Sequence, residues 1–450
     1  MSDLLNIGSS AVRAYKGALG AIGENVANAE TPGFSRRTVV VKQAPTPGIS
    51  PDPVYREQVL FSGVEVAGVQ RAWDSFRASE ARFAASAAGM ASTREQWLIS
   101  VETALGNSSA TVGSSMTSFF NSATALALNP DDMLGRATML TTLSDVAGAF
   151  RMSGSALARV SEGIADAAGL DIAAVNKALA ALDDINGTIR SSMPGGQARA
   201  TLEDQRDQLI DYVAQRLDVS ANVAGDGTVD LTLAGASTVS LVNGLGPGFL
   251  GMAVSTDGRI ALQITKEGTT SPLPATSGSL AGLVRVAGST ADRLAALDTL
   301  ASDFATEIND WSAAGLDLAG NPGPALLDAS GGAVAMETLV TDPALVAAES
   351  TDGRLNGNLL ALDALRGPNG AEARWNALVS DSATALAAVK SEASAAASWR
   401  DNSFASLDEV TGIDLDREAA ELLRFQQAYG AASRIIQVAR DTFETLLSAL

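Results

Sequence analysis

The hydrophobic positions near the N-terminus repeat with helical spacing. From Met1 to Val26 they recur at intervals of four and three residues, and Gly8 is the one gap. This is the heptad pattern of a helix that packs along one side. Thr31-Pro32-Gly33 cannot continue a helix, so we expect it to end near Ala29.

The C-terminal segment has a similar pattern. From Leu415 to Leu450, apolar residues recur almost wholly at intervals of three and four, up to the last residue. A helix at the end of an isolated domain usually frays into polar residues. We therefore predict two amphipathic terminal helices that pair with each other, with neighbouring molecules, or with both. A helical bundle with both helices in its core stays open as the alternative.

Between the ends, the pattern is mainly helical with one β-rich interruption. From Asp218 to about Thr265 the apolar period changes from 3.6 to 2, and Asp226-Gly227 and Asp257-Gly258 are typical of hairpin turns. The N-terminal helix is followed by short strands and a Pro-rich loop from Pro45 to Pro53. Helical spacing covers residues 73–105, 114–127, 131–189 (with glycine interruptions), 201–217, 280–314 and 371–399.

These elements predict a mainly α fold with a β-rich insertion, organised in four parts. Long terminal helices would form a coiled-coil assembly domain, beside a helical middle domain and a small outer β domain. The expected limits are 1–35 plus 408–450 for the assembly domain, 36–217 plus 279–313 plus 367–407 for the middle domain, 218–278 for the β-rich outer domain, and 314–366 for an irregular outer segment.

The composition excludes many kinds of chemistry. The 450 residues include no histidine and no cysteine, which removes Ser-His-Asp and Cys-His catalysis, thiolate or imidazole metal sites and disulfides. Lys and Arg number 31 against 51 Asp and Glu, a formal charge of −20. Such a chain repels phosphate backbones and anionic membranes, so we expect neither nucleic acid nor membrane as a partner.

The motifs that could indicate a ligand are weak, and we expect no cofactor, no metal and no enzymatic activity. Gly246–Gly251 matches G-x-G-x-x-G, but an extended run follows it where the dinucleotide fingerprint needs a helix. Asp226–Asp230 lacks the distal Glu of a calcium loop. No span of about 20 apolar residues is present, nor a cleavable signal peptide.

A segment after the first helix resembles a known signature. Residues 25–36, NVANAETPGFSR, are similar to the pattern N-[IV]-A-N-x-x-T-P-G-[YF]-[ST]-R of bacterial flagellar axial proteins, the rod, hook and hook-associated proteins. The residues that carry the resemblance are Asn25, Asn28, Thr31, Pro32, Gly33 and Phe34. Asn and Thr side chains can satisfy the helix end there, and Pro-Gly turns the chain away.

Three further segments narrow the resemblance to the hook-associated protein 1 family. The run EAAELLRFQQAY before the last helix resembles that family's C-terminal pattern. Residues 202–210, LEDQRDQLI, resemble its L-x-D-Q-R-D-x-L helix, and residues 315–323 resemble its G-x-D-x-x-G-x-x-G segment. The histidine usual before that glycine is absent; Ala313-Ala314 stand there.

The resemblance implies a structural junction adaptor between the hook and the filament. It implies export by the flagellar type III apparatus, a flagellar location with a cytoplasmic stage before export, and assembly of copies through the terminal helices. The implied partners are other copies of the chain in a ring or helix, the hook protein, a second junction protein, and a cytoplasmic export chaperone at the C-terminal region. The residues expected at the assembly surfaces are Val12, Tyr15, Leu19, Ile22, Leu422, Phe425, Gln426, Tyr429, Ile435, Phe443 and Leu446.

Other interpretations stay open. A rod or distal hook protein shares the N-terminal signature, but the 202–210 helix and the EAAELLRFQQAY run speak against it. Flagellin has helical ends without this form of residues 28–34, and a secreted adhesin has no need for seams at both termini. A carboxylate-based enzyme on a helical scaffold is the alternative of a different class; no spacing of acids indicates its pocket.

Overall fold

The computed structural model describes residues 2–44, 63–106 and 111–448. Within them the chain is mainly helical with a β-rich insertion, as predicted, and the strands of the insertion lie between α5 and α6. Among the described residues, none of the helices combines the length and the hydrophobicity that a membrane span requires. The α-helices are α1 (Ser2–Ala27), α2 (Ser75–Gly106), α3 (Val112–Leu126), α4 (Met133–Ser191), α5 (Gln197–Ala214), α6 (Ser279–Ala314), α7 (Gly357–Ala361), α8 (Ala371–Thr411) and α9 (Leu415–Ser448).

The strands are short and antiparallel wherever their register is defined. Strands β1 (Arg37–Gln43) and β2 (Val64–Arg71) form a two-stranded sheet with a bulge between Val40 and Val41. The insertion contains β3 (Val219–Val223), β4 (Val229–Leu233), β5 (Ala236–Asn243), β6 (Gly246–Pro247), β7 (Phe249–Val254), β8 (Ile260–Lys266) and β9 (Thr269–Pro272). Two-residue strands β10 (Gly315–Leu316), β11 (Leu327–Asp328), β12 (Glu337–Thr338) and β13 (Glu349–Ser350) follow α6, among the 3-10 turns η1 (Ala333–Ala335), η2 (Pro343–Leu345) and η3 (Leu362–Arg366).

The internal contacts divide the chain into two compact units. The first comprises residues 1–85, 175–249 and 397–450, and the second comprises residues 86–174 and 250–396. These limits differ from the four-part organisation expected from the sequence, which stays a prediction. The insertion holds two separate sheets, β3–β6 and β7–β9, and the boundary between the units falls at residues 249 and 250.

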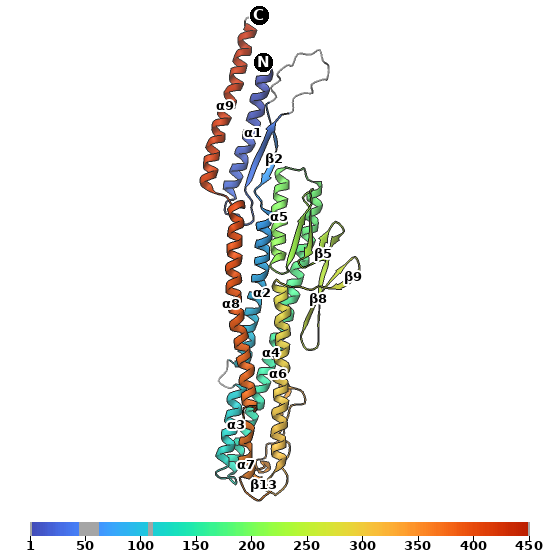
Figure 1. The fold of residues 1–450 in the computed structure, drawn as a ribbon, viewed down its shortest axis with the longest axis vertical. Coiled ribbons are helices and arrows are strands. Elements are labelled where there is room, and N and C mark those ends of the chain that lie inside the picture. The colour runs from blue at the N-terminus through green and yellow to red at the C-terminus, as the bar shows by residue number, and fades with distance from the viewer. Residues whose placement is uncertain (1, 45–62, 107–110, 449–450) are drawn as a thin grey trace. The chain divides into compact units, whose positions relative to one another are not determined.

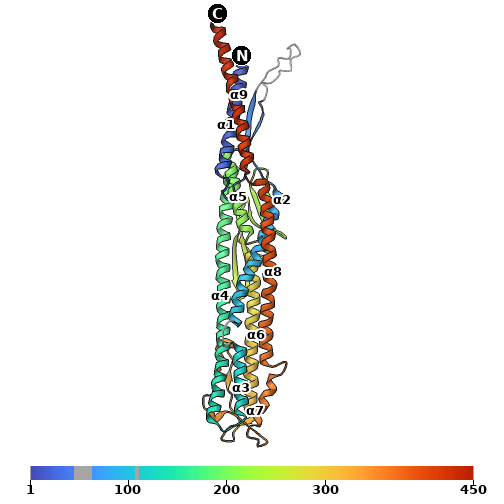
Figure 2. The same ribbon diagram turned by 90° about the vertical axis from the view of Figure 1, so that its left-hand side faces the viewer.

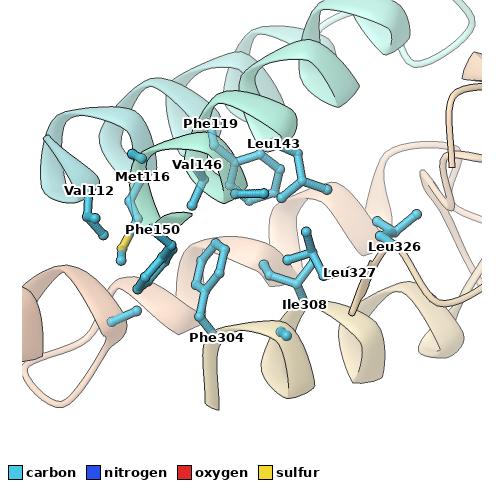
Figure 3. Packing of buried hydrophobic residues seen from close by; sticks show 14 of the residues in the cluster. Val112, Met116, Phe119, Leu143, Val146, Phe150, Phe304, Ile308, Leu326 and Leu327 are labelled. Atoms are coloured by element: carbon cyan, nitrogen blue, oxygen red, sulfur yellow. The ribbon is translucent and has the colours of Figure 1, made fainter. Parts of the chain in front are cut away.

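The second unit has a continuous hydrophobic core. Aromatic rings of three helices meet in it: the Phe119 ring centroid lies 6.3 Å from that of Phe304, which lies 6.2 Å from that of Phe150. Figure 3 shows these rings with Val112, Met116 and Leu143 from α3 and α4. Tight packing of large side chains therefore contributes to holding this unit together.

Several expected elements differ in extent from the observed ones. Helix α4 is one uninterrupted helix, because its glycines are accommodated inside it and do not break it. Helix α8 continues to Thr411, beyond the predicted end at residue 399. The Pro-rich loop from Pro45 to Pro53, and residues 107–110 of the predicted break before α3, lie outside the described residues.

The Asp-Gly pairs and the G-x-G-x-x-G run are turns and strand connections of the β-rich segment. Val223 pairs with Val229 across the Asp226-Gly227 turn, and Gly227 has a φ of 83°, so this hairpin prediction is confirmed. Strands β7 and β8 are neighbours on either side of Asp257-Gly258. Gly246 and Gly251 lie in β6 and β7, and no helix follows β6, so the G-x-G-x-x-G match is a connection between strands.

Candidate assembly site at the paired termini

The two terminal helices lie side by side and antiparallel within the first unit (Figures 1 and 2). The rings of Tyr15 and Phe425 have centroids 6.1 Å apart. At the gap in the seam, a Cβ on Gly8 would lie only 2.7 Å from Ile436 Cγ1. The glycine therefore lets α9 approach α1, and the gap in the heptad pattern is a contact point.

Helix α9 extends past the start of α1. Gly8 faces Ile436, and α1 begins only six residues before Gly8. Since the helices are antiparallel, α1 offers α9 no partner beyond about Thr442. All residues from Asp441 to Ser448 are accordingly exposed, including Phe443 at 53% and Leu446 at 50%.

Asn25 joins three chain segments near the other end of the pair. The backbone N–H of Arg37 donates to Asn25 Oδ1 at 2.9 Å, and Asn25 Nδ2 donates to the Arg37 carbonyl oxygen at 2.9 Å. Asn25 Nδ2 also donates to Glu418 Oε2 at 3.0 Å. The buried amide thus satisfies the backbone at the start of β1 while holding the first turn of α9.

Glu418 is fully buried and has two polar partners. Arg36 Nε donates to Glu418 Oε1 at 2.6 Å, beside the bond from Asn25 to the other carboxylate oxygen. The backbone N–H of Arg36 also donates to the carbonyl oxygen of Thr411 at 2.8 Å. A buried carboxylate is tolerated when it is paired and hydrogen-bonded, so Glu418 fixes the start of α9 on the signature segment.

Helix α5 supplies the carboxylates that pair with the strand arginines. Asp204 Oδ2 accepts from Arg37 Nη2 at 2.9 Å, and Asp207 Oδ2 accepts from Arg71 Nη2 at 2.9 Å. These aspartates are three residues apart and therefore share a face of α5. The Arg37 guanidinium also lies 4.5 Å from the centroid of the Phe34 ring. The internal LEDQRDQLI segment and the two strands that follow the N-terminal signature thus form one charged, buried contact.

Asp211 lies one turn beyond Asp207 on α5. Burial raises the pKa of the Asp211 carboxyl above its ordinary value, and the Arg82 guanidinium, with Nε 2.6 Å from Asp211 Oδ1, acts in the opposite direction. The net direction is upward. The folded unit therefore holds this proton more tightly than the unfolded chain does.

The turn after α1 is built around Gly33. Its φ is 74°, and a Cβ there would lie 2.4 Å from Gln208 Nε2, so a side chain would be strained and crowded. Gln208 Nε2 instead donates to the carbonyl oxygen of Pro32 at 3.1 Å. Asn28 closes the helix end, because its Nδ2 donates to the Glu24 carbonyl oxygen at 2.9 Å.

The structure divides the residues expected from the sequence into two groups. Some are involved in contacts within the chain: Ile22 and Asn25 are buried, and Val12, Tyr15, Leu19, Asn28, Phe34, Leu422 and Phe425 are partly buried. The others are exposed: Thr31, Pro32, Gly33, Gln426, Tyr429, Ile435, Phe443 and Leu446. That neighbouring copies bury any of them stays a prediction.

Sequence reasoning missed the charged residues that connect these segments. Arg37, Arg71, Asp204, Asp207 and Glu418 were not predicted, although each is nearly or fully buried. Asp204 and Asp207 lie in the LEDQRDQLI segment, and Glu418 lies in the EAAELLRFQQAY run. A charged residue inside such a motif is the sequence signal that could have identified them. Their pairing across more than 130 positions could not be read from local periodicity.

The contacts between α1, α9 and α5 can fix the register of the two terminal helices. They also leave an apolar surface exposed on α9. Among the described residues, no group of three or more Asp or Glu side chains is placed to hold a metal ion. The exposed apolar positions of α9 include Leu423 at 59%, Val438 at 60% and Leu447 at 59%. Surface of this kind is typical of protein contacts.

Comparisons with known proteins agree on one family. The family model described as flagellar hook-associated protein FlgK helical domain matches residues 98–327, about half of the chain. A flagellar hook-associated protein 1 of Salmonella typhimurium is 28% identical over 53% of this chain, and the match spans only 42% of that relative. That of Escherichia coli is 23% identical over the full length of both chains, and that of Bacillus subtilis is 24% identical over 98% of this chain and 96% of its own.

A solved structure has a related fold. The flagellar hook junction protein FlgK from Burkholderia pseudomallei superposes with a TM-score of 0.50 at 22% identity, covering 56% of this chain and 46% of that chain. At this identity the likeness concerns the fold alone.

Proposed function

The chain belongs to the flagellar hook-associated protein FlgK family, and from this premise we propose that it is a structural protein of the bacterial flagellum that joins the hook to the filament. It acts mechanically, as an adaptor between two tubes, and needs no cofactor. The observation that carries the proposal is the pair of terminal helices, which are joined to each other and still expose an apolar stripe on α9.

The stripe is the proposed contact between copies. Helix α9 uses Phe425 and Ile436 against α1, yet leaves Tyr429, Phe443 and Leu446 exposed. Burial of apolar surface is the main favourable term in protein association. Copies arranged around a ring or helix would each cover the stripe of a neighbour, as a heterologous interface does.

The remaining partners follow from the proposed position. The hook protein and a second junction protein would lie on either side of this adaptor, and a cytoplasmic chaperone would cover the C-terminal region before export. Export by the flagellar type III apparatus would bring the chain to the flagellum. An apolar stripe exposed on a free subunit is an aggregation hazard, which supports a chaperone at α9.

Deletion of the gene tests the proposal, with electron microscopy of the cells and analysis of flagellin in the medium. We expect hooks without filaments and flagellin released into the medium, both restored by the full-length chain. Normal filaments in the deletion strain would contradict the proposal. Loss of the hook itself would overturn the junction assignment in favour of a rod or distal hook protein.

A further inference from the structure

A groove in the first unit is open beside the signature turn. It has a volume of about 600 Å³ and lies among residues 29–35, helix α5 and the end of α8. We call it the turn groove. The larger apolar residues of its lining are Pro32, Phe34, Trp73, Tyr212, Phe404, Leu407 and Ile413.

The charges of the turn groove have one sign. Glu30, Asp207, Asp211 and Asp408 line it, and the described lining includes no Lys or Arg. Asp207 and Asp211 already accept hydrogen bonds from arginines. Glu30 and Asp408 are exposed, and no cation of the described residues forms an ion pair with either. The rim of the groove is therefore complementary to a basic side chain.

The chain itself carries a surface of the opposite sign on α1. Arg13 and Lys16 are exposed on this helix, and neither has an ion-pair partner in the described part of the chain. Gly17, Gly20 and Gly23 continue the same helical face at spacings of three, and a Cβ on any of them would meet open space. Glycine weakens a helix relative to alanine, and no contact within the described residues requires these three.

We propose that the turn groove of one copy receives the Arg13–Gly23 face of α1 from a second copy. Glu30 and Asp408 would pair with Lys16 and Arg13, while the glycines let the helix approach the apolar walls. A chain with a net charge of −20 repels its copies, so complementary local charges are needed to bring two together in one orientation. This contact rests on the proposed function, because it requires copies to assemble side by side.

A cysteine pair tests the contact in flagellated cells. The chain has no cysteine, so Lys16→Cys together with Glu30→Cys introduces the only two thiols. Within one copy they cannot meet: Lys16 and Ala27 are about 16 Å apart along α1 at ~1.5 Å per residue, and Glu30 follows beyond that end. A disulfide needs Cα atoms within about 7 Å. Any cross-link between these two positions therefore joins two copies.

We expect oxidation of isolated flagella to give cross-linked dimers and longer chains with the double variant. Each single variant is a control. Its yield of cross-linked dimer should be at least about tenfold lower, because in the proposed contact the same position in two copies does not come within disulfide distance. Normal filaments without the cross-link would overturn this contact and leave the junction role intact. If the unaltered gene failed to restore filaments to the deletion strain, the proposed function would itself be wrong.

If the cysteine variant does not assemble, exchanging the charges between the turn groove and α1 tests the same contact. Glu30→Lys with Asp408→Lys should reduce filament-bearing cells about tenfold, because like charges would then oppose each other. Adding Arg13→Glu and Lys16→Glu should restore them. Failure of the combined variant to restore filaments, when each pair alone abolishes them, would contradict the pairing.

The identity of the occupant is tested by a photocrosslinking residue at Tyr212, which lines the groove and is 40% exposed. Benzoylphenylalanine keeps the aromatic ring of Tyr212 and adds a photoreactive benzoyl group at an exposed position of the groove. We expect irradiated flagella to give an adduct with a second copy, mapped to residues 13–23. An adduct with a different flagellar protein would overturn the proposed occupant.

Discussion

The carboxylate of Glu418 connects the two ends of the chain. It is fully buried at the start of α9 and accepts hydrogen bonds from Asn25 of α1 and from Arg36 before β1. Removing one member of a buried ion pair leaves the other charge without compensation, which costs more than the pair itself contributes. Glu418 is therefore one of the contacts that fix the register of the terminal helices.

Glu418→Ala should lower the free energy of unfolding by about 3 kcal/mol, because the largely buried Arg36 guanidinium would lose its partner. Glu418→Gln keeps the acceptor for Asn25 and should lose less. Urea unfolding followed by circular dichroism measures both. Glu421→Ala is the matched control: it breaks a partly exposed pair with Arg424 and should cost at most about 1 kcal/mol. Equal losses in all three variants would contradict a special role for Glu418.

Asp211 gives a prediction of pH dependence. Its pKa is raised above 3.8 by burial, so the folded state binds this proton more tightly than the unfolded chain. The contribution of Asp211 to stability is therefore largest at low pH and falls as the pH rises above about 3.8. Asp211→Asn lacks this titration. The free energy of unfolding of the wild type minus that of the variant should decrease with rising pH; a difference that grows would disprove the assignment.

At the scale of elements, the terminal helices stabilise each other. Most of the stability of an amphipathic helix such as α1 comes from packing of its apolar face against a partner. The close approach at Gly8, the Tyr15–Phe425 contact and the Asn25–Glu418 bond are distributed along α1. The helix pair is thus held along most of α1, and only the last turns of α9 are left without an internal partner.

Gly8→Val should loosen the helix pair, because the new side chain would overlap with Ile436. Overpacking of this kind typically costs about 1–3 kcal/mol. Chemical denaturation of the purified protein measures the loss. Gly187→Val is the control, since a Cβ at Gly187 in α4 meets open space and should change the free energy of unfolding by about 0.5 kcal/mol or less. An unchanged stability of Gly8→Val would contradict the observed register.

Leu446→Asp should leave the folded monomer unchanged and abolish assembly. Leu446 is 50% exposed, and it lies beyond the part of α9 that α1 can reach. Its proposed partner is therefore another copy. Burying the Asp carboxylate in that apolar interface without a partner would be too costly for the copies to associate. Complementation of the deletion strain and unfolding of the purified variant separate the two effects. Thr445→Asp places the same charge one position away as a control; filament growth with Leu446→Asp would disprove the interface.

The sequence predicted the types of the main elements because their periodicity is a local property. The seams from Met1 to Val26 and from Leu415 onward, and the change of period at Asp218, correspond to α1, α9 and the β-rich insertion. The pairing of Arg37 with Asp204 could not be predicted, since it depends on the fold bringing 167 positions together. The sequence also could not predict which seam residues face the other terminal helix. The apolar stripe is wide, so one part of it packs within the chain while another part stays exposed.

At the scale of the whole molecule, two kinds of contact stabilise the chain: hydrophobic packing and buried charge pairs. Hydrophobic packing forms the core of the second unit, and the buried ion pairs lie in the first. Buried charged side chains meet where the segment after α1, the internal LEDQRDQLI segment and the start of α9 come together. Because each of these charges is paired or hydrogen-bonded, they fix the relative positions of the three segments.

The position of the protein in the flagellum tests the central claim most directly. Thr256→Cys introduces one thiol at an exposed turn between β7 and β8, in a chain that has none. Flagella isolated from cells that carry this variant are labelled with maleimide-gold and imaged by electron microscopy, with the unaltered chain as control. We expect gold in a single narrow band between hook and filament. Label along the rod, along the hook or along the whole filament would contradict the junction role.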